Sequence, residues 1–291
     1  MKKNWMSAKY LVLFFTLTLA WTWTCGFIPV LFGLTGTGVG MFIFYFGGGA
    51  PSVVALFLVF LTYPKDKRKD YFRRCFSFRY MGLKWPLITI VVFTLLTVLS
   101  VSIGVGLIGY EAPTMDYIKA IAANPLNILL VLLLSLISGP LNEEFGWRGY
   151  ALDRLFIKFG FLKGSLILGF IWAIWHLPWY FTPGQAQYNL LRDSALYAIM
   201  FIPSVMLLSV FVSFVYVKTN RSILAGALVH MFSNLIGSQL LSTYTTEISM
   251  LIRYTNMVFF LGVILYVLRS QKFREEVVLV IERIQKQKEE D

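Results

Sequence analysis

Three short polar segments interrupt a chain that is otherwise mostly apolar, and their residue types could carry out acid–base chemistry. Two adjacent carboxylates, Glu143 and Glu144, stand shortly before Arg148. The two histidines of the chain, His176 and His230, lie in separate apolar stretches. A carboxylate and an imidazole can share a water molecule and activate it for attack on an amide carbonyl. The three segments therefore predict hydrolytic chemistry if the fold brings them together.

The spacing within two of these segments places side chains on a common helix face. Glu144 and Arg148 are at positions i and i+4 with the acid first, the favourable order for an ion pair, which would leave Glu143 unpaired. His230 and Asn234 have the same spacing, so both would present polar groups to one side of their helix. Such a pair could stabilise an oxyanion, a contribution of about 10²–10³ in rate per donor.

The segment around His176 is rich in aromatic residues and contains a proline. Trp172, Trp175 and Trp179 surround the histidine in sequence, and Pro178 follows it by two residues. Because proline has no backbone N–H to donate, we expect the helix to kink just past His176. A kink among tryptophans would leave room for water or substrate.

Each polar residue has a structural alternative when it is taken singly. An acidic pair at a helix end is usually solvated, a histidine among tryptophans can be a hydrogen-bonded structural residue, and a His–Asn pair can join two helices. Ionisable groups inside apolar spans are nevertheless costly and usually mark function. The combination favours one hypothesis, in which Glu143 and His176 activate a water while His230 and Asn234 stabilise the oxyanion.

The composition of the whole chain is that of a membrane protein. Of its 291 residues, 57% are hydrophobic and 14% are charged, with a mean hydropathy of +0.69. These values exclude a disordered chain, a disulfide-rich secreted domain and an ordinary soluble enzyme. We expect an all-α, multi-pass bundle in the cell membrane with about eight transmembrane helices. The expected spans lie near 10–32, 39–61, 85–109, 125–142, 164–181, 195–217, 222–241 and 254–268.

The net charge of +11 indicates how the chain is oriented in the membrane and does not indicate a nucleic-acid-binding surface. With eight spans, 23 of the 26 basic residues fall on one side, which predicts that both termini are cytoplasmic. The cytoplasmic set comprises Lys2, Lys3, Lys9, the segments 65–84 and 148–163, Lys218, Arg221 and the segment 269–288. Only Lys119, Arg192 and Arg253 fall outside.

Two regions follow from this pattern. Residues 1–268 form the predicted transmembrane domain, with its candidate catalytic residues at 143–234 and an expected catalytic cavity open to the cytoplasm. Residues 269–291 form a predicted cytoplasmic tail that packs on the membrane or on a partner. Apolar side chains recur in that tail at helical spacing, which is typical of an amphipathic helix: Phe273, Val277, Val280, Ile281 and Ile284.

The polar segments together resemble the CPBP family of intramembrane proteases, which includes the type II CAAX prenyl endopeptidases. The family motifs match in order as EExxxR at 143–148, an aromatic residue followed four positions later by histidine at Trp172 and His176, and HxxxN at His230 and Asn234. Many members have phenylalanine where this chain has Trp172. The residues that carry the resemblance are concentrated in the segment 140–235.

The resemblance implies a role for each matched residue. It implies that Glu143 and His176 activate the water, that Glu144 and Arg148 support the site, and that His230 and Asn234 form the oxyanion hole. It also implies a metal-free reaction that cuts after a prenylated cysteine in a C-terminal CaaX sequence and releases a tripeptide. The expected partners are therefore membrane lipid and a protein or peptide substrate with a prenylated C-terminus.

Two alternatives stay open at this point. Glu, His and His are acceptable catalytic-zinc ligands, although the chain has no HExxH motif, so the first alternative is a zinc-dependent membrane protease. The second is a non-catalytic bacteriocin-immunity or transport protein.

The expected span boundaries leave one problem of geometry. They place Glu143 near the cytoplasmic end of its helix and His176 roughly 18 Å inside. Bringing the two together requires a tilt, a re-entrant stretch after Gly146 or a different start for the fourth span.

Overall fold

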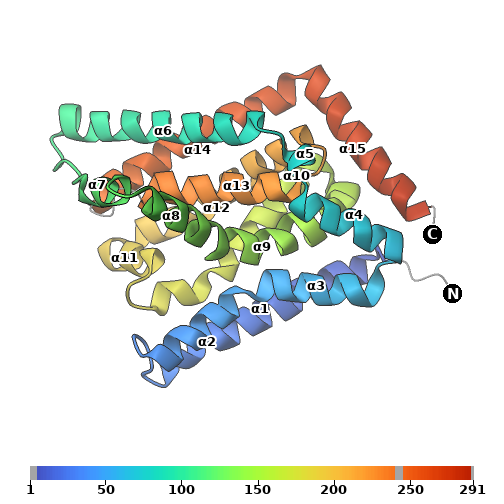
Figure 1. Cartoon of the computed structure of the whole chain (residues 1–291), viewed down its shortest axis with the longest axis horizontal. Coiled ribbons are helices and arrows are strands. Elements are labelled where there is room, and N and C mark those ends of the chain that lie inside the picture. Colours follow the sequence, from blue (N-terminus) through green and yellow to red (C-terminus); the bar gives the residue numbers. More distant parts are fainter. Residues whose placement is uncertain (1–4, 240–244, 290–291) are drawn as a thin grey trace.

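A computed structural model describes residues 5–239 and 245–289, and all of its regular elements in these ranges are helices (Figure 1). The α-helices are α1 (Ala8–Leu31), α2 (Gly38–Gly48), α3 (Ala50–Thr62), α4 (Lys65–Phe76), α5 (Phe78–Met81), α6 (Lys84–Ile103), α7 (Asp116–Ala122), α8 (Pro125–Ile137), α9 (Pro140–Gly146), α10 (Leu152–Trp175), α11 (Ala186–Asp193), α12 (Ala195–Lys218), α13 (Ile223–Asn234), α14 (Thr246–Arg269) and α15 (Gln271–Glu289). Shorter segments are the π-helices η1 (Gly104–Ile108), η2 (Trp147–Ala151) and η4 (Leu235–Gln239) and the 3₁₀-helix η3 (Leu177–Phe181).

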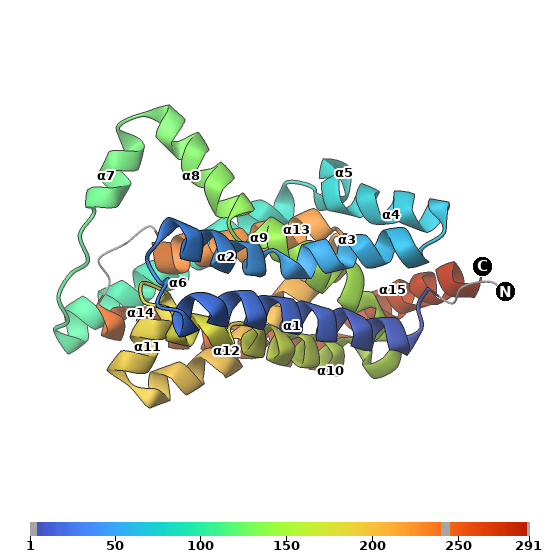
Figure 2. The same ribbon diagram turned by 90° about the horizontal axis from the view of Figure 1, so that it is seen from below.

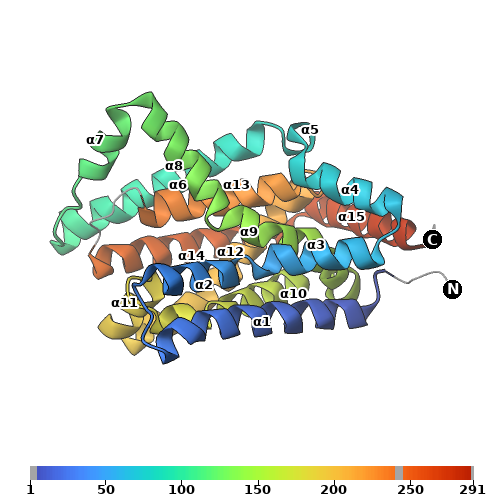
Figure 3. The same cartoon turned by 60° about the horizontal axis from the view of Figure 1, so that its bottom comes forward.

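The predicted fold class, an all-α multi-pass membrane bundle, is confirmed. Among the described residues, five helical segments are long and apolar enough to cross a membrane, and the bent pair α2–α3, which turns by 48°, could add a sixth. The α7–α8 segment stands away from the other helices as an arm (Figure 2), while α1 to α3 run along one side of the bundle (Figure 3). The count of eight spans and the cytoplasmic placement of both termini stay predictions.

A helical hairpin from α9 to α10 carries two of the predicted motifs. The helix that begins at α9 continues through η2 into α10, and the chain turns at Gly160, whose φ of 72° suits glycine. The two arms pack closely beyond the turn, since a Cβ on Gly164 would lie 3.1 Å from the Leu155 carbonyl oxygen. Further along, the rings of Trp147 and Trp175 are 6.0 Å apart.

This hairpin removes the problem of geometry left by the expected boundaries. Glu143 precedes Gly160 by 17 residues and His176 follows it by 16, so both lie roughly 24–26 Å from the turn. The two residues are therefore level, on opposite arms. The helix of Glu143 extends well past Gly146, whereas the expected fourth span ended near residue 142.

The segment 148–163, expected as a cytoplasmic loop, is helical instead, and two of its basic residues are buried. Arg148 is 0% exposed and Arg154 is 3% exposed. Arg154 donates to the Tyr63 hydroxyl at 2.9 Å and to the carbonyl oxygens of Tyr150 and Trp5. A charge count treats every basic residue as solvated, whereas these two are held by polar partners inside the protein. The cytoplasmic placement of the segment stays a prediction.

A buried ionic network lies at the same end of the bundle as Gly160 and joins α4, α10 and the loop before α13. Arg74 donates to Asp70 at 3.0 Å and to the Tyr216 hydroxyl at 2.8 Å. Tyr216 donates to Asp153 at 2.8 Å, and Arg221 forms an ion pair with the same carboxylate. Burial alone would raise the pKa of Asp70, but the positive charges of Arg74 and Arg221 outweigh it and hold that pKa below its usual range.

The predicted amphipathic helix at the C-terminus is present as α15, but its apolar face packs on the protein itself. Phe273, Val280 and Ile284 are buried. The Phe273 ring lies 5.1 Å from Phe161 on α10 and 4.9 Å from Phe214 on α12. The expectation that this face packs on the membrane or on a partner is therefore corrected for these three residues.

Candidate active site

Trp172 on α10 contacts residues from each of the three predicted motifs. Its indole Nε1 donates to Glu143 Oε2 at 2.5 Å. Its ring centroid lies 4.8 Å from that of His230 in an edge-on arrangement and 4.7 Å from the guanidinium carbon of Arg148. Its backbone carbonyl contacts His176 Nδ1 at 2.8 Å. These five residues, Glu143, Arg148, Trp172, His176 and His230, are called the Trp172 cluster below.

The two oxygens of Glu143 have different surroundings. Oε2 accepts hydrogen bonds from Trp172 and, at 3.3 Å, from Trp147 Nε1. Oε1 has no hydrogen-bond partner among the described residues and lies beside Gly139, where an added Cβ would approach it to 3.3 Å. Glu143 thus lacks an ion-pair partner, as the spacing predicted, but two indoles fix its position and leave one oxygen open.

Glu144 joins the first and third motifs. Its Oε1 accepts from Arg148 Nη1 at 2.9 Å, which is the ion pair that the spacing predicted. The same oxygen lies 3.1 Å from His230 Nδ1, a contact that spacing could not predict because 86 residues separate the two. Since a carboxylate oxygen that binds a guanidinium is an acceptor, Nδ1 of His230 carries the hydrogen. Arg148 also donates to Ser209 Oγ on α12 at 3.2 Å.

His176 caps the C-terminus of α10, where the helix ends instead of kinking. The α-helix stops at Trp175 and the chain continues as η3, because Pro178 cannot donate to a helical carbonyl and disfavours helical geometry in the residue before it. A backbone carbonyl can only accept, so His176 Nδ1 donates to Trp172 and the neutral ring presents the Nε2 lone pair.

The aromatic surroundings expected for His176 are present. Its ring centroid lies 4.6 Å from Trp175 and 5.3 Å from Trp179. Phe201 on α12 adds a third ring at 5.2 Å, which the sequence did not reveal because α12 is distant in the chain. These rings keep the imidazole in an apolar setting with a fixed orientation.

Asn234 is the last residue of α13, one helical turn beyond His230. It is half-buried, and the π-helix η4 follows it directly. The structure therefore puts both residues of the third motif on one helix that reaches the Trp172 cluster through His230. The oxyanion role of the pair stays a prediction.

Helix α9, which carries Glu143, is held by neighbouring helices through backbone contacts. Ser52 Oγ on α3 donates to the Leu141 carbonyl and Tyr71 OH on α4 donates to the Phe145 carbonyl, both at 2.8 Å. At Gly146 the helices approach so closely that a Cβ would lie 2.4 Å from the Pro51 carbonyl oxygen. Gly146 lies within the EExxxR motif at a position that the motif leaves free, so the motif gave no signal for it.

Replacing Gly146 by alanine is expected to lower the free energy of unfolding by about 1–3 kcal/mol, because overpacking must move α9 away from α3. The same shift would displace Glu143 from Trp172 and lower the rate of any reaction that needs it. Thermal unfolding in detergent measures the stability. Gly262→Ala is the matched control, since nothing lies within 4 Å of its Cβ position. Equal melting temperatures for the two variants would contradict this description of the α3–α9 contact.

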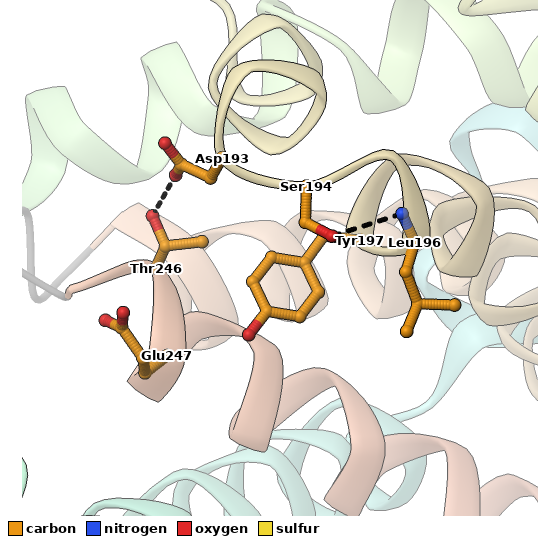
Figure 4. Close-up of a pocket in the computed structure, with 6 residues that line it drawn as sticks. All are labelled: Asp193, Ser194, Leu196, Tyr197, Thr246 and Glu247. Carbon is orange, nitrogen blue, oxygen red and sulfur yellow. Dashed lines mark hydrogen bonds between the residues drawn. The ribbon is translucent and has the colours of Figure 1, made fainter.

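A cavity of about 520 Å³ lies elsewhere, at the start of α12 and α14. It is lined by Asp193, Ser194, Leu196, Tyr197, Thr246 and Glu247 (Figure 4). None of these residues belongs to the Trp172 cluster, and Asp193 already accepts a hydrogen bond from Thr246. The expected catalytic cavity open to the cytoplasm is a different feature and stays a prediction.

Comparison with known proteins agrees with the three motifs. Residues 125–236 match the family described as type II CAAX prenyl endopeptidase Rce1-like. Over 217 residues the chain is 26% identical to the protein named CAAX prenyl protease 2 of Methanococcus maripaludis, a similarity that covers 75% of this chain and 79% of that protein. Every residue of the Trp172 cluster lies inside the matched segment.

Proposed function

We propose that the chain is an intramembrane endopeptidase of the Rce1-like type II CAAX prenyl endopeptidase family, whose model matches residues 125–236, and that it cuts after a prenylated cysteine near the C-terminus of its substrate. The observation that carries the mechanism is the Trp172 cluster. One tryptophan contacts a buried carboxylate and two imidazoles that come from three separate motifs. Such a set of groups suits water activation at an amide carbonyl.

In this mechanism the water lies between Glu143 Oε1 and His176 Nε2. Glu143 takes one proton from the water, and the oxygen forms a bond to the carbonyl carbon of the scissile amide. Glu143 then delivers the proton to the leaving nitrogen as the C–N bond breaks. The hydrogen bonds to Oε2 support this role, because they orient the carboxylate and leave Oε1 for the water.

His230 and Asn234 would stabilise the oxyanion of the tetrahedral intermediate. His230 Nδ1 faces Glu144, so donation from Nε2 to an oxyanion requires the doubly protonated ring. The Glu144 carboxylate can stabilise that imidazolium while Arg148 fixes the carboxylate from the other side. Glu144 and Arg148 are positioning residues in this proposal, and they act through His230.

We propose this reaction without a metal. Among the residues that the structure describes, no group of three His, Cys, Asp or Glu side chains is placed to hold a metal ion. Glu144 is already bound to a guanidinium, and Glu143 accepts from two indoles. Every step above therefore uses only the side chains of the chain.

A cleavage assay tests this function. The purified protein is incubated with a farnesylated peptide that ends in Cys-Val-Leu-Ser, or with the same peptide without the lipid, and products are identified by mass spectrometry. We expect release of Val-Leu-Ser, faster from the lipidated peptide and unchanged by 1,10-phenanthroline. The substrate assignment fails if the wild-type protein leaves the lipidated peptide intact. Loss of activity with the chelator that only zinc restores would replace the metal-free mechanism.

A further inference from the structure

Arg253 on α14 is a half-buried cation in a candidate membrane span, and the mechanism above does not use it. Its Nη1 donates to the neutral Ser204 hydroxyl at 2.8 Å, and its guanidinium carbon lies 5.3 Å from the Phe201 ring centroid. Its Nε is buried without a hydrogen-bond partner. Within residues 5–239 and 245–289 it forms no ion pair, unlike the buried Arg148 and Arg221. An uncompensated charge in a span is costly and points to a missing anionic partner.

The counting of basic residues predicts that Arg253 lies on the external side, and the structure places it near His176. Both side chains contact Phe201, whose ring lies 5.2 Å from that of His176. The guanidinium carbon of Arg253 is therefore within about 10.5 Å of the imidazole, which is the sum of its 5.3 Å and 5.2 Å distances through Phe201.

The helix positions agree with this distance. His176 is 16 residues beyond the turn at Gly160, and Arg253 is 16 residues before the end of α14. These two reference points lie at the same end of the bundle, since Phe161 and Phe273 are in ring contact at 5.1 Å. Each residue is thus roughly 24 Å along its helix from that end, and the two are level.

A second polar group without a partner lies on the same helix. Asn256, three residues after Arg253, has a buried Oδ1 with no hydrogen-bond partner. Its Nδ2 lies 3.9 Å from the Cβ position of Gly237 on η4, the segment that follows Asn234. The stretch of α14 that carries Arg253 and Asn256 therefore lies near two parts of the site. It shares the contact with Phe201 with His176, and it lies beside η4, which follows Asn234.

We propose that Arg253 binds the C-terminal carboxylate of the substrate, an inference that rests on the proposed CAAX cleavage. A guanidinium presents a planar fork that pairs with a carboxylate through two hydrogen bonds. Three extended residues span about 10–11 Å, so a C-terminal tripeptide is long enough to reach Arg253 from the proposed water at His176. In this arrangement the substrate carboxylate supplies the negative charge that would pair with Arg253.

The test compares two farnesylated peptides that end in Cys-Val-Leu-Ser, one with a free C-terminal carboxylate and one with a carboxamide. Wild type, Arg253→Met and Arg253→Lys are assayed for kcat/KM on both. Arg192→Met is the matched control, because it removes one positive charge from an exposed arginine. Melting temperatures and gel-filtration profiles show whether each variant is folded.

We expect wild type and Arg192→Met to prefer the carboxylate peptide by about 10- to 100-fold, the range for a hydrogen bond to a charged group. Arg253→Met should lose that preference and keep the wild-type rate on the carboxamide, whereas Arg253→Lys should keep part of it. Equal rates of wild type on the two peptides, or an unchanged preference in Arg253→Met, would overturn the inference.

Binding separates this inference from the proposed function. If wild type cleaves neither peptide, the proposed function fails, and the tripeptide Val-Leu-Ser and its carboxamide are then tested as ligands by thermal shift. Stabilisation by the free acid in wild type that is absent in Arg253→Met supports the carboxylate site. The same response to acid and amide, or the same response in both proteins, overturns it.

Discussion

Replacing Glu143 by glutamine is expected to lower kcat by about 10²–10⁴-fold, the usual contribution of a general base. The glutamine carbonyl can still accept from Trp172 and Trp147, so the local structure should persist, but the amide cannot take a proton from water. The free energy of unfolding should change little. Initial rates on the farnesylated peptide and thermal unfolding of the same preparation measure the two effects together.

The matched control for this variant is Glu111→Gln, which makes the same chemical change at an exposed carboxylate. It should retain the wild-type rate. If Glu143→Gln is folded and its kcat lies within tenfold of the wild-type value, Glu143 is not the base. The reaction would then need another proton acceptor.

Removing the Glu144 carboxylate is expected to have the largest effect on stability. Glu144 and Arg148 are both 0% exposed, and breaking such a pair from one side costs about 3–5 kcal/mol because an uncompensated charge stays buried. Glu144→Leu would also remove the acceptor of His230 Nδ1. We expect a lower free energy of unfolding in detergent, with a fall in activity through His230.

The double variant Glu144→Leu/Arg148→Met makes this prediction specific to the pair. Removing both charges replaces an ion pair with apolar side chains of similar size, which is often close to neutral for stability. The double variant should therefore be more stable than Glu144→Leu alone and remain less active than wild type. Strictly additive losses from the two single substitutions would show that the pair is not coupled. Glu144→Gln provides a milder change if Glu144→Leu does not fold.

Contacts within one helical turn could be predicted from the sequence. The Glu144–Arg148 pair follows from i, i+4 spacing, and the aromatic contacts of His176 follow from the local abundance of tryptophan. These features are local, so helix geometry alone determines them. The all-α membrane class likewise follows from composition.

Contacts between distant segments could not be predicted in the same way. Trp172 was expected only as the aromatic of a motif, yet it contacts Glu143, His230 and Arg148, which come from other turns of the chain. Spacing gives the face on which a side chain lies but not the element that it meets. Trp147 is a partial exception, because its position four residues after Glu143 could have predicted their hydrogen bond.

The treatment of basic residues shows the limit of charge counting. Arg148 and Arg154 were counted as cytoplasmic and Arg253 as external, a placement that stays a prediction, but all three lie in helices with their side chains wholly or partly buried. Hydropathy patterns register a charge as an interruption, but a buried charge with hydrogen-bond partners does not interrupt a helix. The turn itself lies at Gly160, where a positive φ is required.

A single-turnover experiment tests whether Glu143 in the Trp172 cluster is the base that activates water for hydrolysis. Enzyme in excess over the farnesylated Cys-Val-Leu-Ser peptide is sampled over time, and Val-Leu-Ser is quantified by mass spectrometry for wild type and Glu143→Gln. This measurement isolates bond cleavage from product release. We expect a wild-type rate constant about 10²–10⁴-fold above that of the variant. Equal single-turnover rate constants for the two folded proteins would contradict it.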